Sequence, residues 1–303
     1  MSRLFVTGRS GFVGQHLEAA LLVLPTADWQ LIESARFDLL DPASLDAALA
    51  ETCPDAVIHL AGQTFVPEAF RDPQRTFEVN LLGTLNLLQA LKRRGFSGTF
   101  LYVSSGDVYG RVDESDMPIA EHLMVKPRNP YAVSKVSAEL LCQQWAYTES
   151  WRVMIARPFN HIGSGQNESF LVADMARQLV RIKRGLQAPV LHVGDVDVTR
   201  DFLDVRDVVA AYLLLLEKGQ RGEVYNLCSG VERRVSELIM DMAHLAGVTV
   251  TFKQNPGKFR RAEQRRVVGC SEKIQKQTGW KPHAEFSETL LSVLSDWEVR
   301  EAH

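Results

Sequence analysis

The sequence predicts an α/β fold in which a doubly wound parallel sheet is followed by a smaller, mixed C-terminal lobe. Short apolar runs alternate with longer helix-like segments through the first half, the order that gives parallel strands with helices on both faces. The apolar runs are continuous, as in strands that are buried on both sides. After Pro158 the alternation stops, so a differently organised part is expected from there.

Strands and helices can be assigned in order along the first half. Gly95 ends one expected helix, and Pro130 suits the first turn of another, where its missing N–H has no partner to lose. The expected strands are Leu4–Val6, Gln30–Ile32, Ala56–Leu60, Thr99–Ser104 and Arg152–Ala156, and the expected helices are Gln15–Val23, Asn80–Arg93 and Tyr131–Gln144.

The second half has a weaker pattern. Residues 159–195 are expected to form loop and helix, Val208–Glu217 a buried helix, Glu223–Leu227 a late strand and residues 228–303 a mixed tail. We therefore divide the chain into residues 1–157, a nucleotide-binding part, and residues 158–303, a substrate lobe. Part of residues 196–227 is expected to return to the sheet.

Composition narrows the class of protein. The 303 residues are 46% hydrophobic and 23% charged, as in ordinary globular proteins. A net charge of −3 and a pI of about 6.3 argue against a nucleic-acid or anionic-membrane partner. The four cysteines form no Cys-x-x-Cys pair, which argues against a zinc site and fits reduced thiols. With no signal-peptide layout and no apolar run near the ~20 residues of a membrane span, we expect a cytoplasmic protein.

A glycine-rich loop joins the first strand to the first helix. Thr7–Gly14 contains Gly-x-x-Gly-x-x-Gly. Gly8 permits the tight turn, Gly11 lets the backbone approach a pyrophosphate, and Gly14 lets the helix pack closely on the sheet. A pyrophosphate would lie on the free N–H groups at the helix N-terminus. The loop therefore predicts a dinucleotide site.

The type of dinucleotide stays open. An acidic ribose ligand is expected ~20 residues past the loop, and Glu33 is close to that place, which suits NADH. Arg9 and Arg36 are equally near and suit the 2′-phosphate of NADPH. Asp38 follows, and the small pair Ala61-Gly62 ends a later strand, where a cofactor can approach closely.

Three residues predict carbonyl reduction. Tyr131 and Lys135 lie one helical turn apart on one face, so the lysine cation is expected to lower the phenol pKa from its usual ~10. Ser105 follows another strand, and its hydroxyl could donate to a carbonyl oxygen held beside Tyr131. Each motif alone recurs by chance, but together with the glycine loop they favour a redox enzyme.

These motifs resemble those of the extended short-chain dehydrogenase/reductases, a family that acts mostly on nucleotide sugars. The resemblance covers essentially the whole chain. It implies a Rossmann lobe for NADPH or NADH, a C-terminal lobe for the nucleotide sugar, and a homodimer through the helices at Asn80–Arg93 and Tyr131–Gln144. The matching segments are Thr7–Gly14, His59–Gly62, Asn80, Ser105–Gly110, Tyr131–Lys135, Arg157–Asn160, Arg200–Phe202, Arg261–Glu263 and Thr278–Pro282.

Within the family, the chain is most similar to members that reduce GDP-4-keto-6-deoxy-D-mannose. This implies GDP-D-rhamnose as product, for a D-rhamnose-containing surface polysaccharide such as lipopolysaccharide. The implied catalytic residues are Ser105, Tyr131 and Lys135. The implied cofactor contacts are Gly8, Ser10, Gly11, Phe12, Val13, Arg36, Asp38, Leu39, Leu60, Ala61, Gly62, Asn80, Tyr131, Lys135 and Phe159. The implied substrate contacts are Gln63, Ser105, Gly106, Asp107, Asn160, Arg200, Arg261 and Glu263, with Phe159 also lining the sugar pocket. No metal is expected.

Several alternatives remain at this point. Related dehydratases have an acid where this chain has Gly106, which argues against dehydration. Related epimerase–reductases have a cysteine at the position of Asp107, which argues against epimerisation at C3 or C5. A GDP-sugar 4-epimerase and a reductase forming GDP-6-deoxy-talose stay open. So does a non-enzymatic NAD(P)-sensing regulator, although such a protein has no need of Ser105, Tyr131 and Lys135 together.

Overall fold

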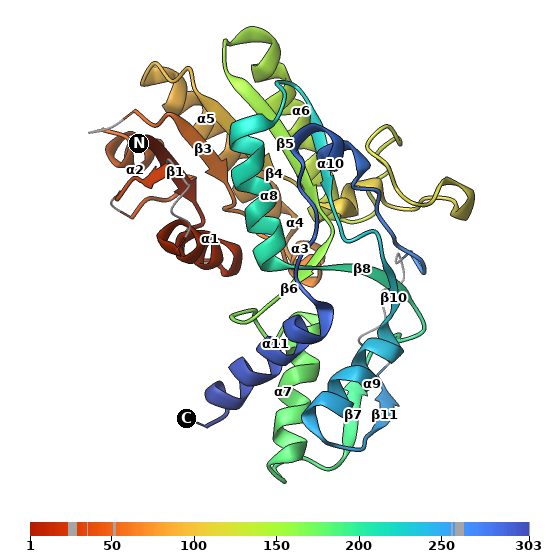
Figure 1. Cartoon of the computed structure of the whole chain (residues 1–303). Helices are drawn as coiled ribbons and strands as arrows, with labels where there is room; N and C mark the ends of the chain where they lie inside the picture. The colour runs from red at the N-terminus through yellow and green to blue at the C-terminus, as the bar shows by residue number, and fades with distance from the viewer. Residues whose placement is uncertain (24–28, 35, 51–52, 256, 258–263, 303) are drawn as a thin grey trace.

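A six-stranded parallel sheet forms the centre of the computed structural model, which describes residues 1–23, 29–34, 36–50, 53–255, 257 and 264–302 (Figure 1). The strand order is β2-β1-β3-β4-β5-β9. The strands are β1 (Ser2–Thr7), β2 (Trp29–Leu31), β3 (Ala56–His59), β4 (Thr99–Val103), β5 (Arg152–Pro158) and β9 (Val224–Leu227). The predicted α/β class with a Rossmann-type sheet is confirmed.

Helices cover both faces of the sheet. One apolar core lies under α1 (Phe12–Val23), α8 (Val205–Lys218) and α10 (Glu272–Thr278). A second core lies under α2 (Pro42–Ala48), α5 (Gly83–Arg93) and α6 (Pro130–Thr148). β3 is buried along its whole length, which explains why its sequence is a continuous apolar run.

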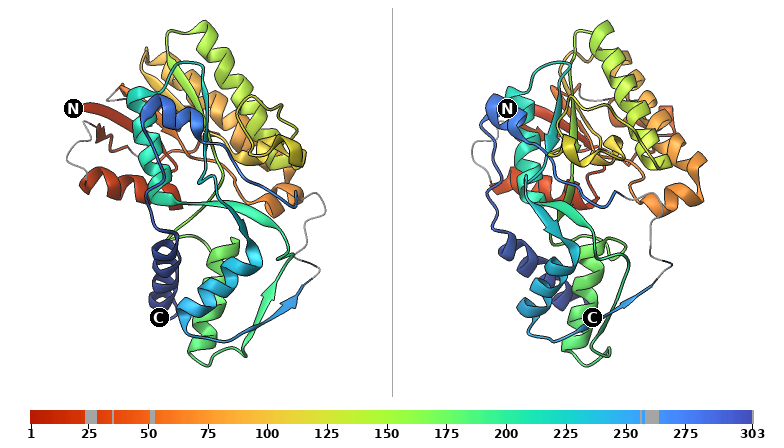
Figure 2. Two further views of the ribbon diagram at one scale, coloured as in Figure 1. Left: turned by 45° about the vertical axis from the view of Figure 1, so that its right-hand side comes forward. Right: turned by 90° about the vertical axis from the view of Figure 1, so that its right-hand side faces the viewer.

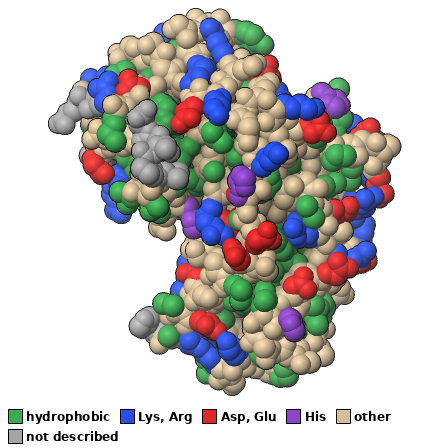
Figure 3. All heavy atoms as spheres, in the orientation of Figure 1, with side chains coloured by type: hydrophobic (Ala, Val, Ile, Leu, Met, Phe, Trp, Pro, Cys, Tyr) green, Lys and Arg blue, Asp and Glu red, His purple; other side chains and the backbone are tan. Residues whose placement is uncertain are grey.

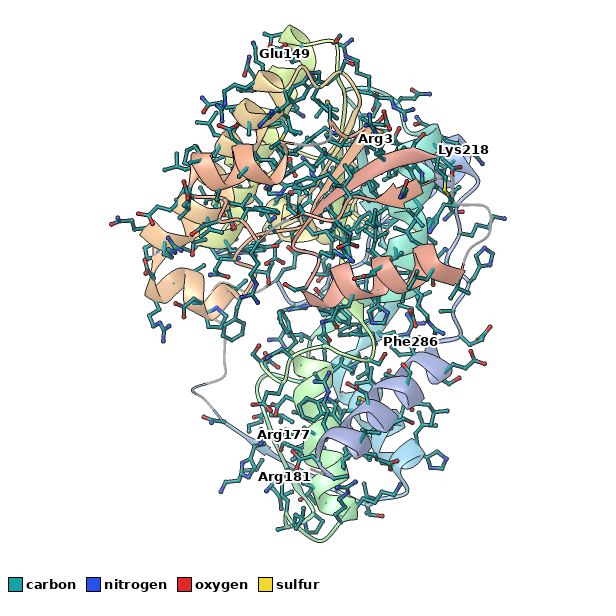
Figure 4. All side chains as sticks on the ribbon, turned by 90° about the vertical axis from the view of Figure 1, so that its left-hand side faces the viewer. Arg3, Glu149, Arg177, Arg181, Lys218 and Phe286 are labelled. Carbon is teal, nitrogen blue, oxygen red and sulfur yellow. The ribbon has the colours of Figure 1, made fainter. Side chains whose placement is uncertain are left out.

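The chain changes direction across the sheet between β1 and β3. From β1 it runs outward to β2 and then returns to pair β3 with β1 on the other side. The carboxyl ends of the strands at such a reversal are where α/β sheets bind ligands. Arg3 in β1 and Glu149 after the last turn of α6 mark the opposite end of this part of the molecule (Figure 4). The carboxyl ends of the strands and the N-terminus of α6 therefore face the second part of the chain.

The second part lies beyond these strand ends (Figures 1 and 2). Its apolar core is formed mainly by three helices, α7 (Leu171–Lys183), α9 (Val235–Ala246) and α11 (Phe286–Arg300). Arg177 and Arg181 of α7 both pair with Glu301, just past α11 (Figure 4). Two small sheets complete this part: β10 (Glu232–Arg234), β8 (Thr199–Asp204) and β6 (Asn160–Ile162), then β11 (Thr251–Gln254) and β7 (Val190–Val193).

Two sequence expectations differ from the structure. Residues 159–195, expected to be loop and helix, also contain β6 and β7, which are too short for a periodic pattern to reveal. The helix expected from Asn80 begins as a π-helical segment, Glu78–Leu82, and is α-helical only from Gly83. Two short helices, α3 (Val66–Arg71) and α4 (Pro73–Phe77), precede that segment. A π-helical turn depends on backbone hydrogen bonds to i−5 and carries no side-chain signature.

The face of the molecule drawn in Figure 3 shows no large area of a single charge sign. Acidic and basic side chains are interspersed over the face in Figure 3, in keeping with the small net charge. Among the described residues, no helix combines the length and the apolar character that crossing a membrane requires.

Candidate active site

The glycine loop is held at the end of β1 by close backbone contacts. Gly8 has a φ of 74°, and a Cβ on it would lie 2.8 Å from the Ala61 nitrogen. A Cβ on Gly14 would lie 2.4 Å from the carbonyl oxygen of Arg9. Because α1 begins at Phe12, its first N–H groups have no partner within the helix. The predicted loop residues Ser10, Gly11, Phe12 and Val13 thus lie at a helix N-terminus suited to a pyrophosphate.

Two residues expected near the cofactor ribose form an ion pair with each other. Arg9 Nη1 lies 2.9 Å from Glu33 Oε2, and Arg9 Nε donates to Glu18 Oε2 at 3.0 Å. The Arg9 hydrogen bond holds the pKa of Glu18 below its usual value. Glu33 keeps 79% of its side chain exposed, and Arg36 is exposed nearby. Arg9 therefore pairs with both Glu18 and Glu33 in the place where the sequence predicts the cofactor ribose.

A hollow of about 480 Å³ lies beside the glycine loop. Its walls come from the segments that follow β2 and β3 and from the start of the π-helical segment. Asp38 caps its own turn, since Oδ1 accepts the N–H of Leu40 at 2.9 Å. The lining residues are Phe37, Asp38, Leu39, Leu40, Ala61, Gly62, Gln63, Arg75 and Val79. Four of the predicted cofactor contacts thus line one open space.

The N-terminus of α6 brings the three predicted catalytic residues together. Asn129 caps the helix by accepting the N–H of Ala132 at 2.7 Å. Tyr131 and Lys135 are both buried, and the hydroxyl of Ser105 hydrogen-bonds to the Tyr131 phenol. Lys135 Nζ donates to the Val103 carbonyl at 2.8 Å. A phenol and a serine hydroxyl therefore lie side by side with an ammonium group one turn away.

The electrostatics differ in one respect from the sequence expectation. Burial and the charge of Asp107 raise the pKa of Tyr131, although the Ser105 hydrogen bond works in the opposite direction. The expected lowering of this pKa by Lys135 is therefore not seen, because burial dominates and the ammonium is directed to the Val103 carbonyl. Burial lowers the pKa of Lys135 to about 8, while the nearby Glu139 carboxylate works against this shift.

Asn80 connects the loop after β3 to α6. Its Oδ1 accepts the Gln63 N–H at 2.7 Å, and its Nδ2 donates to the Gln63 carbonyl and to Ser134 Oγ, both at 2.9 Å. Ser134 in turn donates to the Tyr131 carbonyl at 2.7 Å. A Cβ on Gly62 would lie 2.9 Å from Asn80 Oδ1. Sequence reasoning missed Ser134; its place inside the Tyr-x-x-x-Lys turn was the available signal.

The predicted substrate contacts nearest Tyr131 lie in one area. A Cβ on Gly106 would lie 3.1 Å from the ring of Phe159, which is buried with Val108 and Tyr109. Asp107 is exposed, and its N–H donates to Ser105 Oγ at 3.2 Å. The side chain of Gln63 bonds to its own loop and to α4, with Nε2 donating to the Phe65 carbonyl and to Thr76 Oγ1, both at 3.2 Å.

The glycine loop also contacts the segment that starts the second part. The rings of Phe12 and His161 are stacked, with centroids 6.1 Å apart and an interplanar angle of 2°. His16 Nε2 lies 2.8 Å from the Ser164 carbonyl oxygen. Asn160, at the start of β6, is exposed.

The remaining predicted substrate contacts are not brought to Tyr131 by any described contact. Arg200 is buried in β8 and donates to the carbonyls of Thr199 at 2.6 Å and Arg265 at 3.3 Å. Arg261 and Glu263 lie outside the described residues. Gln264, the next described residue, bonds to the backbone of Val112 on the loop after β4.

Comparison with known proteins places this geometry among nucleotide-sugar enzymes. The sequence model of the family described as GDP-mannose 4,6 dehydratase matches residues 5–292. The chain is 60% identical, over 98% of both sequences, to GDP-6-deoxy-D-mannose reductase of Pseudomonas aeruginosa. It is 28% identical, over 90% of both sequences, to GDP-6-deoxy-D-talose 4-dehydrogenase of Aggregatibacter actinomycetemcomitans.

Solved structures of nucleotide-sugar enzymes also match this fold. The structure of RMD from Pseudomonas aeruginosa complexed with NADPH matches with a TM-score of 0.95 and 59% identity, covering 99% of this chain and 100% of that one. UDP-glucose 4-epimerase of Thermotoga maritima with UDP-glucose matches with a TM-score of 0.86 and 26% identity, covering 99% of each chain.

Proposed function

The chain belongs to the GDP-mannose 4,6-dehydratase family, and on that premise we propose that it reduces the 4-keto group of GDP-4-keto-6-deoxy-D-mannose to give GDP-D-rhamnose. It is an NAD(P)-dependent oxidoreductase. The observation that carries the proposal is the Tyr131 phenol bonded to Ser105 beside Lys135, in a chain 60% identical to GDP-6-deoxy-D-mannose reductase.

The mechanism gives each of the three residues a distinct role. The nicotinamide cofactor supplies the hydride for C4 of the sugar. Tyr131 gives its proton to O4 as that oxygen becomes an alkoxide, and Ser105 donates a hydrogen bond to the same oxygen. Lys135 would hold the nicotinamide ribose of the bound cofactor, and its ammonium, one helical turn away, would stabilise the tyrosinate that remains. The phenol is protonated before reaction, which the raised Tyr131 pKa favours.

The cofactor is proposed to be NADPH rather than NADH. The matched relative is complexed with NADPH, and Arg9 can exchange Glu33, a highly exposed partner, for a 2′-phosphate. The glycine loop would hold the pyrophosphate, and the hollow lined by Asp38, Leu39 and Ala61 would receive the adenosine. Arg9→Ser should lower kcat/KM for NADPH and leave kcat/KM for NADH nearly unchanged.

The sugar nucleotide is proposed to bind mainly to residues 158–303. Arg200 and Arg261 would bind the diphosphate, because a guanidinium fork suits phosphate oxygens, and Glu263 would accept a hydrogen bond from the nucleotide ribose. Gln63, Gly106, Asp107 and Asn160, with Phe159, would surround the sugar.

The exposure of Asp107 supports reduction without epimerisation. An exposed carboxylate is a weak base for a carbon acid, since its pKa is ordinarily near ~4. Turnover in D₂O with unlabelled NADPH should leave protium at C3 and C5 of the product, as read by NMR. Deuterium at either carbon, above the enzyme-free background, would move the chain to the epimerase–reductases.

The chain is also proposed to form a homodimer, in the cytoplasm, that supplies GDP-D-rhamnose for a surface polysaccharide. Val133, Leu140 and Tyr147 are exposed on α6 at intervals of seven residues, with 37%, 62% and 87% of their surface accessible. This spacing gives one apolar stripe along the helix, and a second copy of the same helix is its proposed partner. Leu140→Arg should convert a dimer to a monomer in light scattering.

The decisive assay is oxidation of NADPH in the presence of GDP-4-keto-6-deoxy-D-mannose, followed by NMR of the product. Equimolar NADPH oxidation, with the new C4 hydroxyl of the product assigned as equatorial as in GDP-D-rhamnose, supports the proposal. The C4 epimer would assign the chain to talose formation. No oxidation with any nucleotide 4-keto sugar would favour a cofactor-sensing protein instead.

A further inference from the structure

His59 is a buried polar residue at the end of β3 that the proposed mechanism does not use. It is 1% exposed, within a strand whose other residues are Ala56, Val57 and Ile58. Burying an imidazole costs free energy unless both ring nitrogens are hydrogen-bonded. Both are bonded here: Nδ1 lies 2.6 Å from Thr7 Oγ1, and Nε2 lies 2.9 Å from Thr84 Oγ1.

The hydrogen bonds fix which nitrogen carries the proton. Thr7 Oγ1 accepts the Ala61 N–H at 3.1 Å, so its own proton is free to go to His59 Nδ1. Thr84 Oγ1 donates to the Asn80 carbonyl at 2.6 Å, so it must accept from His59 Nε2–H. The imidazole is therefore neutral and protonated on Nε2. Burial and the Lys135 cation support this, since they lower its pKa to about 3.

The two ends of this chain of bonds reach two different parts of the active site. Thr7 and Ala61 belong to the ends of β1 and β3, where the glycine loop and the dinucleotide hollow lie. Thr84 holds the carbonyl of Asn80, whose side chain binds Gln63 and, through Ser134, the Tyr131 carbonyl. The His59 ring also lies 5.8 Å from the Tyr102 ring, over which Lys135 Nζ sits at 5.0 Å.

We propose that His59 is a positioning residue that couples the dinucleotide loops to the Tyr131/Lys135 helix through Thr7 on one side and Thr84 on the other. This inference rests on the proposed function, because it concerns the alignment of cofactor and proton donor in that reaction. Thr7 and Thr84 lie in different elements, and among the described residues His59 is the group that hydrogen-bonds to both.

The test uses near-isosteric variants that remove one hydroxyl each. Thr7→Val removes the hydroxyl that accepts the Ala61 N–H. It should raise the Kd for NADPH about tenfold, the effect of one buried hydrogen bond. Thr84→Val frees the Asn80 carbonyl and should lower kcat about tenfold, with the Kd for NADPH changed less than about threefold.

Thr278→Val is the matched control. Thr278 is also a buried helical threonine that donates to the carbonyl four residues earlier, Ile274, at 2.7 Å, and accepts the Trp280 N–H at 3.1 Å. It lies in α10, on the other face of the sheet. The Thr278→Val variant should lower Tm as much as Thr84→Val does, and it should leave the Kd for NADPH and kcat at wild-type values.

The double variant Thr7→Val/Thr84→Val tests the relay itself. Because both bonds end on one imidazole, the two effects should combine to less than their product. A multiplicative result, or a Thr84→Val enzyme that behaves like Thr278→Val in every kinetic constant, would overturn the proposal. The Kd for NADPH is measured without sugar, so it decides the Thr7 arm even if the wild-type chain fails to reduce GDP-4-keto-6-deoxy-D-mannose and the proposed function falls.

Discussion

The part of the molecule that holds the central sheet and the part that holds α7, α9 and α11 organise their polar residues differently. At the sheet, Ser105 after β4, Asn80 in the π-helical segment, and Ser134 and Tyr131 in α6 are connected by hydrogen bonds. In the second part, the core is apolar, and the candidate sugar contacts Asn160 and Arg200 lie on the paired strands β6 and β8, one exposed and one buried. The proposed chemistry, which needs exact alignment, is thus built on strand ends and a helix, whereas the candidate sugar contacts of the second part come from two short strands of a small sheet.

Tyr131→Phe tests the first half of this comparison and should have the largest effect. Loss of the proposed acid should lower kcat by ~10²–10⁴-fold, the usual contribution of a general acid. The fold and NADPH binding should survive, because the ring is retained. Steady-state assays and NADPH titration of the purified variant check both, and near-normal turnover would remove Tyr131 from the mechanism.

Lys135→Met should reduce both kcat and NADPH affinity, and it should change how stability depends on pH. The folded-state pKa of Lys135, about 8, is below its ordinary 10.5. The folded wild-type protein therefore binds fewer protons than the unfolded chain between these pH values, so wild-type stability rises across this window. Relative to Lys135→Met, the wild type should gain about 3 kcal/mol from pH 7 to pH 10.5. Urea unfolding of both proteins at the two pH values measures the free energy of unfolding. An equal change in that free energy for the two proteins would contradict the prediction.

Ser105→Ala should lower kcat about tenfold to a hundredfold, less than Tyr131→Phe, because it removes one donor to O4 and leaves the acid in place. NADPH affinity should be unchanged, which separates the role of Ser105 from that of Lys135. A loss of NADPH affinity equal to that of Lys135→Met would show that the two roles are not distinct.

Arg200→Ala and Arg261→Ala probe the second half of the comparison and should have the smallest effects. Each should raise KM for the GDP-sugar about tenfold, with KM for NADPH unchanged, because a contact to a non-reacting diphosphate contributes uniform binding. Arg200→Ala alone should also lower Tm, since Arg200 is buried and bonds to the Thr199 and Arg265 carbonyls. Equal changes in both KM values would place these arginines outside the sugar site.

The sequence was most informative where spacing alone determines geometry. Four residues along a helix bring Tyr131 and Lys135 to one face, and three glycines at fixed intervals determine a strand-to-helix turn. It could not show that Asn80 lies in a π-helical segment, that β6 and β7 are strands, or that burial raises the Tyr131 pKa. These depend on backbone hydrogen-bond choices and on what packs around a group, which no residue spacing records.

His59 could be interpreted only in part from the sequence. A histidine inside a buried apolar strand was visible in the sequence, and it implies partners for both nitrogens. Their identities were not visible, because Thr7 is 52 positions away and Thr84 is 25 positions away. Only the pairing of β1 with β3 and the packing of α5 bring them together.

The stacked rings of Phe12 and His161 have a thermodynamic consequence. They join the loop proposed to hold the dinucleotide to the segment that begins the proposed sugar lobe, so we expect this contact to link the free energies of the two binding events. Linkage is reciprocal: whatever factor NADPH contributes to the affinity for the GDP-sugar, the GDP-sugar contributes equally to the affinity for NADPH. Phe12→Ala should therefore change one coupling factor, the ratio of a ligand's affinity with the other ligand bound to its affinity alone, and this change should be the same for NADPH and for the GDP-sugar.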